Sequence, residues 1–258
     1  KCIHENYFTI KAVPYDIPVI GYQNNTVNTL RLWSAELVKD ISDLDSYTKA
    51  DFDTFITNKN WVQRISKILY PDDSSYDGRE LRLTQQYFFV SAGVQSIFRH
   101  FKNNGYDIKE FADKIGIHIN DTHPAVAIPE LMRILIDEEG LDWNEAWEIT
   151  RKTMSYTNHT ILPEALEKWP VDMFRNLLPR IYMIIEEINR RFVLSVNEKY
   201  GNYDKVNDLS ILQDGQIHMA RLAVIGSYSV NGVAAIHTEI LKDYAMSAFH
   251  QKLPHGAG

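Results

Sequence analysis

The chain has 258 residues, of which 45% are hydrophobic and 24% charged, a composition that is typical of globular proteins and excludes disordered and collagen-like classes. A formal net charge of -7 argues against nucleic acid or an anionic membrane as the main partner, because both attract positive surfaces. The single cysteine, Cys2, excludes an internal disulfide framework and favours a reducing compartment. Neither an apolar run of the roughly 20 residues that span a bilayer nor a signal-peptide core is present, so we expect a cytoplasmic protein.

The first third of the chain combines short strands with long helices. Alternating side chains predict a strand over Tyr7 to Val13, and we expect turns at Pro14, Pro18 and Gly21 to end it. A second short strand is predicted over Asn28 to Ser34. Helical spacing predicts a long polar helix from Tyr47 to Ser66. The turn-forming run YPDDSSYDG predicts a loop over Tyr70 to Gly78, before a second long helix over Leu81 to Phe101.

The remaining chain follows the order strand, loop, helix. The alternating run KIGIHIN predicts a strand over Lys114 to Asn120, followed by a helix that starts near Pro124 and ends at Gly140. Four more helices are predicted: Asp142 to Met154, Arg180 to Tyr200, Met219 to Ile225 and Ala235 to Tyr244. No repeat or linker interrupts the pattern, which predicts one helix-rich α/β unit over 1–258.

A first polar cluster, Asn120 to Pro124, follows the predicted strand. Ligands of open α/β sheets bind where strands give way to helices, so Asp121 and His123 could orient a hydroxyl-rich ligand there. The alternative is structural: Asp121 and Thr122 would cap the helix, and His123 would find a buried partner.

A second cluster, Tyr156 to Trp169, reads as a loop with one short helix. Its amides, carboxylates and aromatic rings suit a sugar, although a polar loop with a proline-started helix would have the same composition. Glu164 and Glu167 would lie on one helix face, whereas a glycosidase pair must flank the scissile bond from separate directions. A zinc hydrolase using His123 and His159 is a further alternative, but no HExxH helix supports a metal site.

Five blocks of the sequence resemble the glycogen and starch phosphorylase family in its bacterial form. They occur in the order YDIPVIGYQNNTVNTLRLWSAE, LYPDDSSYDGRELRLTQQYFFV, NDTHPAVAIPELMR, YTNHTILPEALEKWP and IGSYSVNGVAAIHTEILK. The resemblance implies a pyridoxal-phosphate enzyme that cleaves terminal α-1,4-linked glucose from glycogen, starch or maltodextrin with orthophosphate, giving glucose 1-phosphate. It also implies a GT-B fold of two Rossmann-like domains. This chain corresponds to the later part of the N-terminal domain, without the cofactor lysine of the C-terminal domain, so we expect an inactive internal fragment.

The resemblance also implies roles for individual residues. Asp121, His123 and His159 would line the pocket for the transferred glucosyl unit, and Thr160 and Glu167 would line the adjoining channel. Asp73 would belong to a loop that gates the site, with Gly78 as its hinge. The helix from Tyr47 to Ser66 resembles the element that forms the family's homodimer. A different class of function, a non-catalytic glucan-binding module, remains open as the alternative.

Overall fold

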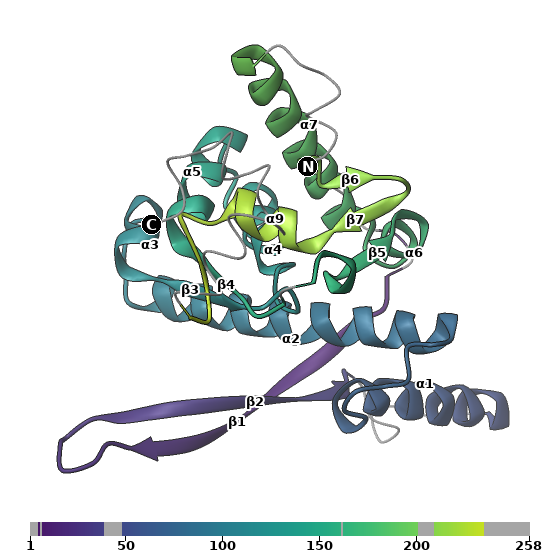
Figure 1. Cartoon of the computed structure of the whole chain (residues 1–258). Coiled ribbons are helices and arrows are strands. Elements are labelled where there is room, and N and C mark those ends of the chain that lie inside the picture. Colours follow the sequence, from purple (N-terminus) through teal and green to yellow (C-terminus); the bar gives the residue numbers. More distant parts are fainter. Residues whose placement is uncertain (1–4, 6, 39–47, 161, 201–208, 235–258) are drawn as a thin grey trace. The chain divides into compact units, whose positions relative to one another are not determined.

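The computed structural model describes residues 5, 7–38, 48–160, 162–200 and 209–234 (Figure 1). These residues form the mixture of helices and strands expected of an α/β fold. The chain divides into two compact units, Lys1–Ala92 and Gly93–Gly258. The prediction that residues 1–258 belong to one domain of a parent protein stays a prediction. The helix predicted over Ala235 to Tyr244 lies outside the described residues.

The first unit begins with a two-stranded antiparallel hairpin. Strands β1 (Ile10–Ile20) and β2 (Val27–Leu37) pair from Ile10 opposite Leu37 to Ile20 opposite Val27. The prediction that Pro14 and Pro18 end the first strand is wrong, because β1 continues through both. Among the described residues β1 pairs on one side only, and the two prolines are four residues apart and therefore on the same side of the strand. Proline is tolerated there because it lacks only a donor that an edge strand can spare.

Helix α1 (Lys49–Lys67) packs on the base of this hairpin. The predicted long helix is confirmed over these residues, and its start is a capping box in which Thr48 and Asp51 bond each other's backbone N–H groups. Its buried residues join a small apolar core made of Ala35, Val62, Ile65, Leu81 and Phe88. The unit is therefore held together mainly at one end of the hairpin.

Helix α2 (Tyr76–Asn103) starts five residues earlier than the sequence predicts. The hydroxyl of Ser75 accepts a hydrogen bond from the N–H of Gly78 at 3.1 Å, so the serine caps the helix and the predicted loop ends there. A Cβ on Gly78 would lie 1.7 Å from the carbonyl oxygen of Asp72. Glycine is therefore required for close backbone approach in this helical turn, and the interpretation of Gly78 as a hinge stays a prediction.

The second unit is built on a parallel sheet of order β3-β4-β8, with strands Ile117–Asn120, Met154–Asn158 and Ser229–Gly232. A separate antiparallel sheet has the order β5-β7-β6, with strands Lys168–Pro170, Gln216–His218 and Leu212–Gln213. The helical segments are η2 (Ile108–Glu110), α3 (Phe111–Lys114), α4 (Ala127–Arg133), η3 (Ile134–Glu138), α5 (Trp143–Thr153), η4 (Pro163–Ala165), α6 (Val171–Leu177), α7 (Pro179–Tyr200) and α9 (Met219–Gly226).

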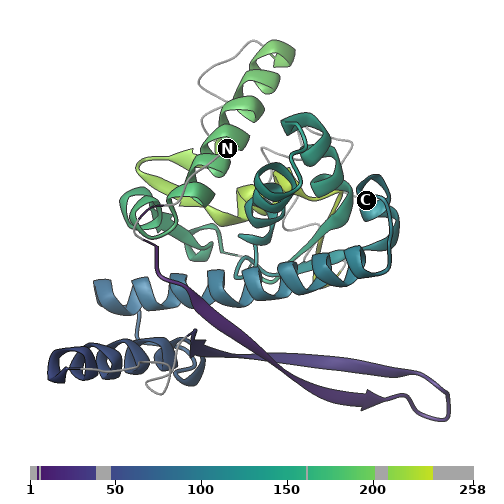
Figure 2. The same ribbon diagram turned by 180° about the vertical axis from the view of Figure 1, so that it is seen from behind.

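Apolar side chains fill one face of the parallel sheet. Ile119, Met154 and Tyr156 are fully buried there, and α9 packs on β4 while α4 packs on α5, α7 and α9. Figures 1 and 2 show α4, α5 and α9 on the same side of β3 and β4. The predicted helices 142–154, 180–200 and 219–225 are thus confirmed as α5, α7 and α9, and the N-cap of α5 is Asp142 as expected. Tyr156, predicted in a loop, instead lies in a central strand.

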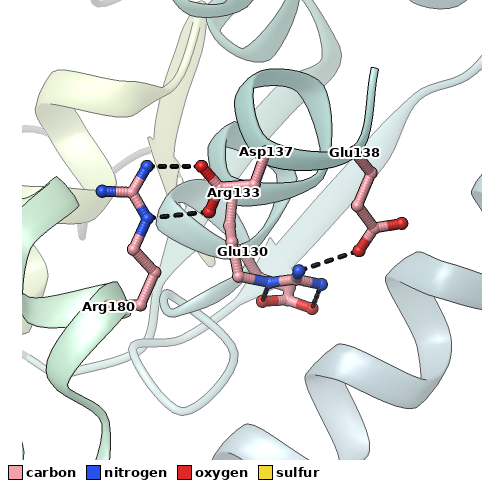
Figure 3. Close-up of polar contacts among 5 residues, drawn as sticks. All are labelled: Glu130, Arg133, Asp137, Glu138 and Arg180. Atoms are coloured by element: carbon pink, nitrogen blue, oxygen red, sulfur yellow. Dashed lines mark hydrogen bonds and ion pairs between the residues drawn. The ribbon is translucent and has the colours of Figure 1, made fainter. Parts of the chain in front are cut away.

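Three ion pairs lie on the helices behind this sheet, and one of them, between Arg180 and Asp137, joins two separate helices (Figure 3). The carboxylate of Glu130, with no exposed surface, accepts two hydrogen bonds from Arg133 at 2.8 and 2.9 Å, and Arg133 also reaches Glu138 at 2.8 Å. Arg180 of α7 donates two hydrogen bonds to Asp137 of η3 at 2.6 and 2.7 Å. Such bidentate pairs orient helices more than they stabilise them, since burial costs hydration.

Candidate functional site at the edge of the parallel sheet

The candidate site lies at the carboxyl edge of the parallel sheet. β3 ends at Asn120 and its neighbour β4 ends at Asn158. Because the strands are parallel, the loops that follow them start at the same edge, which is where open α/β sheets bind ligands. The two polar segments that the sequence analysis selects are these two loops.

Asn120, the last residue of β3, and the two residues that follow it, Asp121 and Thr122, each bond a residue that follows β4. Asn120 Oδ1 lies 2.6 Å from His159 Nε2, and Thr160 Oγ1 donates to Asp121 Oδ2 at 3.4 Å. Thr122 Oγ1 donates to Glu167 Oε2 at 2.8 Å. The structure thus brings together four of the predicted residues, namely Asp121, His159, Thr160 and Glu167. Asn120 and Thr122, which belong to the first polar cluster but were not predicted to bind a ligand, hold His159 and Glu167 there.

Asp121 has a strained backbone. Its φ of 63° lies in the left-handed region, which is uncommon for residues other than glycine. Its N–H donates to the carbonyl of Thr157 at 2.8 Å, and its Oδ1 accepts from the N–H of Thr122. These bonds offset the strain. The prediction that Asp121 caps a helix at Pro124 is wrong, because α4 begins at Ala127 and its N-cap residue is Val126.

Asn158 anchors the loop that carries His159 and Thr160. It is fully buried, donates from Nδ2 to the hydroxyl of Tyr156 at 2.8 Å, and accepts from the N–H of Thr160 at 2.9 Å. Burial raises the pKa of the Tyr156 phenol, so this hydroxyl stays protonated at neutral pH. The start of the loop is therefore held by hydrogen bonds between neutral groups.

The other predicted residues lie outside this set of bonds. His123 is exposed in the turn 123–126, so the alternative that it has a buried partner is wrong. Asp73 is exposed in the first unit, and its role stays a prediction. Glu164 lies in η4, whereas Glu167 follows that short segment and precedes β5, so the two do not share a helix face as predicted.

The donors at this edge suit hydroxyl groups. A carboxylate accepts a hydrogen bond from a sugar hydroxyl, whereas an amide or a hydroxyl side chain can both donate to it and accept from it. Within the described ranges, no group of three or more His, Cys, Asp and Glu side chains is arranged to hold a metal ion. No helix of the described part of the chain is both long and apolar enough to cross a membrane.

Comparison with known families gives the class of this protein. The carbohydrate phosphorylase family matches residues 1–256, so the chain belongs to that family, as the five sequence blocks predict. Glycogen phosphorylase of Bacillus subtilis (strain 168) is 51% identical over 252 residues, 97% of this chain and 30% of that protein. The brain form of Homo sapiens is 48% identical over 257 residues and the muscle form of Oryctolagus cuniculus 46% over 258 residues. The chain spans about 30% of the length of these relatives.

Proposed function

We propose that this chain is part of an α-glucan phosphorylase that cleaves terminal α-1,4-linked glucose with orthophosphate to give glucose 1-phosphate. The observation that carries the proposal is the direct bonding between the two loops at the sheet edge, through Asn120 with His159 and Thr122 with Glu167. The family and the names of the relatives support the same activity. In this proposal the second unit belongs to the N-terminal Rossmann-like domain of a GT-B fold, and the site is completed by a longer polypeptide.

The residues would act on the glucosyl unit by charge. A transition state in glycosyl transfer resembles an oxocarbenium ion, so a carboxylate and a backbone carbonyl aimed at it stabilise the developing positive charge. Asp121 would supply the carboxylate and His159 the carbonyl, while His123 would contact the glucosyl unit from the exposed turn. Thr160 and Glu167 would bind hydroxyl groups of the adjoining channel, and Asp73 would belong to the gate.

Pyridoxal phosphate does not fit the described donors. A phosphate ester needs basic or N–H donors, whereas Asp121 and Glu167 place two carboxylates at this edge and would repel a dianion. We therefore assign the cofactor, its lysine and the orthophosphate site to a part of the parent protein outside this chain. A cytoplasmic location would accord with the single cysteine and the lack of a membrane-spanning helix in the described residues.

The substitution His123→Asn in the full-length parent tests the site assignment. If His123 contacts the glucosyl unit, kcat/KM for phosphorolysis should fall roughly tenfold to a thousandfold, because one polar contact is lost in the transition state. Thermal unfolding should stay unchanged, since His123 is exposed. His100→Asn, at another exposed histidine, is the matched control and should retain the parental kcat/KM. A His123→Asn enzyme with parental kcat/KM would refute the assignment.

A further inference from the structure

Four polar side chains are joined by hydrogen bonds on the face of the parallel sheet that points away from its apolar core. The ring of His118 in β3 lies 2.9 Å from Ser155 Oγ through Nδ1 and 2.8 Å from Thr157 Oγ1 through Nε2. Thr157 donates in turn to Oδ1 of Asn231 in β8 at 2.9 Å. We call these four residues the sheet-face network.

The strand pairing places the whole network on one face. His118 is directly opposite Ser155, and Thr157 is directly opposite Asn231. Ser155 and Thr157 are two residues apart, so both point to the same side of β4. The network therefore connects the three strands of the described parallel sheet through side chains, in addition to the backbone ladder.

The direction of each bond follows from what the groups can donate. The Oδ1 oxygen of Asn231 only accepts, so the single hydroxyl proton of Thr157 must point to it. The amide nitrogen of Asn231 donates to the carbonyl of Gly232 at 2.9 Å, which agrees with this orientation of the amide. Thr157 Oγ1 must then accept from His118, so Nε2 of the ring carries a proton. In neutral imidazole Nδ1 is then unprotonated, and Ser155 donates to it.

Thr157 is also in contact with the candidate site, through its backbone. Its carbonyl accepts the N–H of Asp121, the residue with the left-handed backbone, at 2.8 Å. Thr157 is the second-last residue of β4, so a shift of the end of this strand would move that carbonyl. The side-chain bonds from Thr157 to β3 and β8 oppose such a shift.

We propose that Thr157 is a positioning residue, whose hydroxyl bonds β3 and β8 at once and thereby holds in place the carbonyl that supports Asp121. The effect on catalysis rests on the proposed function, whereas the directions of the hydrogen bonds do not. A hydroxyl suits this role because it accepts from one strand and donates to the other, whereas an isosteric valine does neither.

Nitrogen-15 NMR of the histidine rings in the 258-residue chain tests the bond directions without activity. At about pH 8, where imidazole is generally neutral, His118 should show the tautomer with its proton on Nε2. Thr157→Ser should keep this pattern, whereas Thr157→Val should lose the Nε2–H signal to exchange with water, because its acceptor is gone. His100, at the end of α2, should stay unchanged in both variants. A His118 proton on Nδ1, or identical His118 signals in Thr157→Val, would overturn the proposal.

Asn231→Leu tests the network at the residue that bonds Thr157 rather than the ring. Without the amide oxygen, the Thr157 proton is free to point at Nε2, so both tautomers of His118 become possible. The ring nitrogen shifts should therefore move toward the average of the two tautomers. Asn231→Asp keeps an acceptor oxygen, so it should retain the parental tautomer and is the matched control. Thermal unfolding checks that the variants fold, and unchanged shifts in folded Asn231→Leu would contradict the proposed bond directions.

Kinetics of the full-length parent test the positioning role. Thr157→Val should lower kcat/KM for phosphorolysis about tenfold, mainly through kcat, because Asp121 is proposed to act in the transition state. Thr157→Ser should restore most of the parental value. Thr57→Val, at an exposed threonine whose hydroxyl bonds a carbonyl of its own helix, should leave kcat/KM unchanged.

The outcomes separate this proposal from the proposed function. Parental kcat/KM in Thr157→Val would refute the positioning role, even if the NMR signals of His118 change. Equal losses in Thr157→Val and Thr157→Ser would also refute it, because the serine retains the hydroxyl. A parent that forms no glucose 1-phosphate at all would refute the proposed function and leave the hydrogen-bond directions standing.

Discussion

His218 shows how packing sets the charge of a single residue in the antiparallel sheet. His218 is half-buried at the end of β7, directly opposite Lys168 of β5. Its backbone N–H donates to the carbonyl of Ile211 at 2.8 Å. Burial, followed by repulsion from Arg221 and Lys168, lowers the pKa of His218 to about 4. Its imidazole is therefore neutral in the folded protein throughout the physiological range.

The lowered pKa of His218 predicts a loss of stability in mild acid. Between about 6.5, the ordinary value, and about 4, the unfolded chain binds a proton that the folded chain does not. Stability conferred by the neutral ring is present above pH 6.5 and is lost as pH falls toward 4, with a slope of up to about 1.4 kcal/mol per pH unit. Urea unfolding between pH 4 and 7.5 should show a shallower slope for His218→Gln, whereas His100→Gln should keep the parental slope. Equal slopes for His218→Gln and the parent would contradict this account.

Helix α1 buries apolar side chains on one face and exposes apolar side chains on another. Val62 and Ile65 have no exposed surface, whereas Phe52 and Ile56 are 41% and 37% exposed. Phe52 and Ile56 are four residues apart, so they share a side of the helix, and that side differs from the side of Val62 and Ile65. A helix with a second apolar stripe favours a partner, as the predicted homodimer through Tyr47 to Ser66 requires.

The dimer prediction can be tested at Ile56. Ile56→Glu places a charge on the exposed stripe and should weaken self-association of the full-length parent at least tenfold, because a desolvated charge is costly in an interface. Sedimentation velocity over a concentration series measures this. Thr54→Glu, an equal change at an exposed position on another side of the helix, should leave association unchanged. A parent that is monomeric, or an Ile56→Glu variant that dimerises normally, would exclude α1 as the interface.

At the scale of the whole molecule, the proposed function assigns the sugar to the described site and the phosphate to another part of the parent protein. Asp121, Glu167, Asn120 and Thr160 provide carboxylate, amide and hydroxyl groups that can bond hydroxyls, and the two carboxylates disfavour an anion. Catalysis of phosphorolysis needs both substrates held in one site. A chain that spans about 30% of its relatives would meet only half of this requirement.

We therefore predict that the isolated chain forms no glucose 1-phosphate from maltoheptaose and orthophosphate, even with added pyridoxal phosphate. Product above the blank in a coupled assay would contradict this. Isothermal titration with maltoheptaose tests the alternative that the chain is a glucan-binding module. Millimolar or tighter binding by the chain would support a module. Loss of that binding in Asp121→Asn would locate it at the sheet edge. The full-length parent serves as the positive control for the assay.

The sequence by itself determined the family, most helices and the segments that carry the site. Helices with a clear apolar stripe, such as α7, and a capped start, such as Asp142, were predictable because both signals are local. The residues Asp121, His123, His159, Thr160 and Glu167 were selected through the resemblance to the phosphorylase family, because they stand in contiguous motifs of the sequence. The helix start at Ser75 is also encoded locally, but its turn-forming neighbours made the sequence favour a loop instead.

Only the tertiary structure decided what those residues touch. Proline ends most strands because it has no backbone N–H to donate. The strand β1 nevertheless continues through Pro14 and Pro18, because it pairs with β2 on one side and needs no N–H donor on the other. The bonds from Asn120 to His159 and from Thr122 to Glu167 join positions 39 and 45 residues apart, and parallel pairing of β3 with β4 is what brings them together. Such contacts depend on strand order and backbone direction at the sheet edge, including the left-handed turn at Asp121, and no local pattern encodes either.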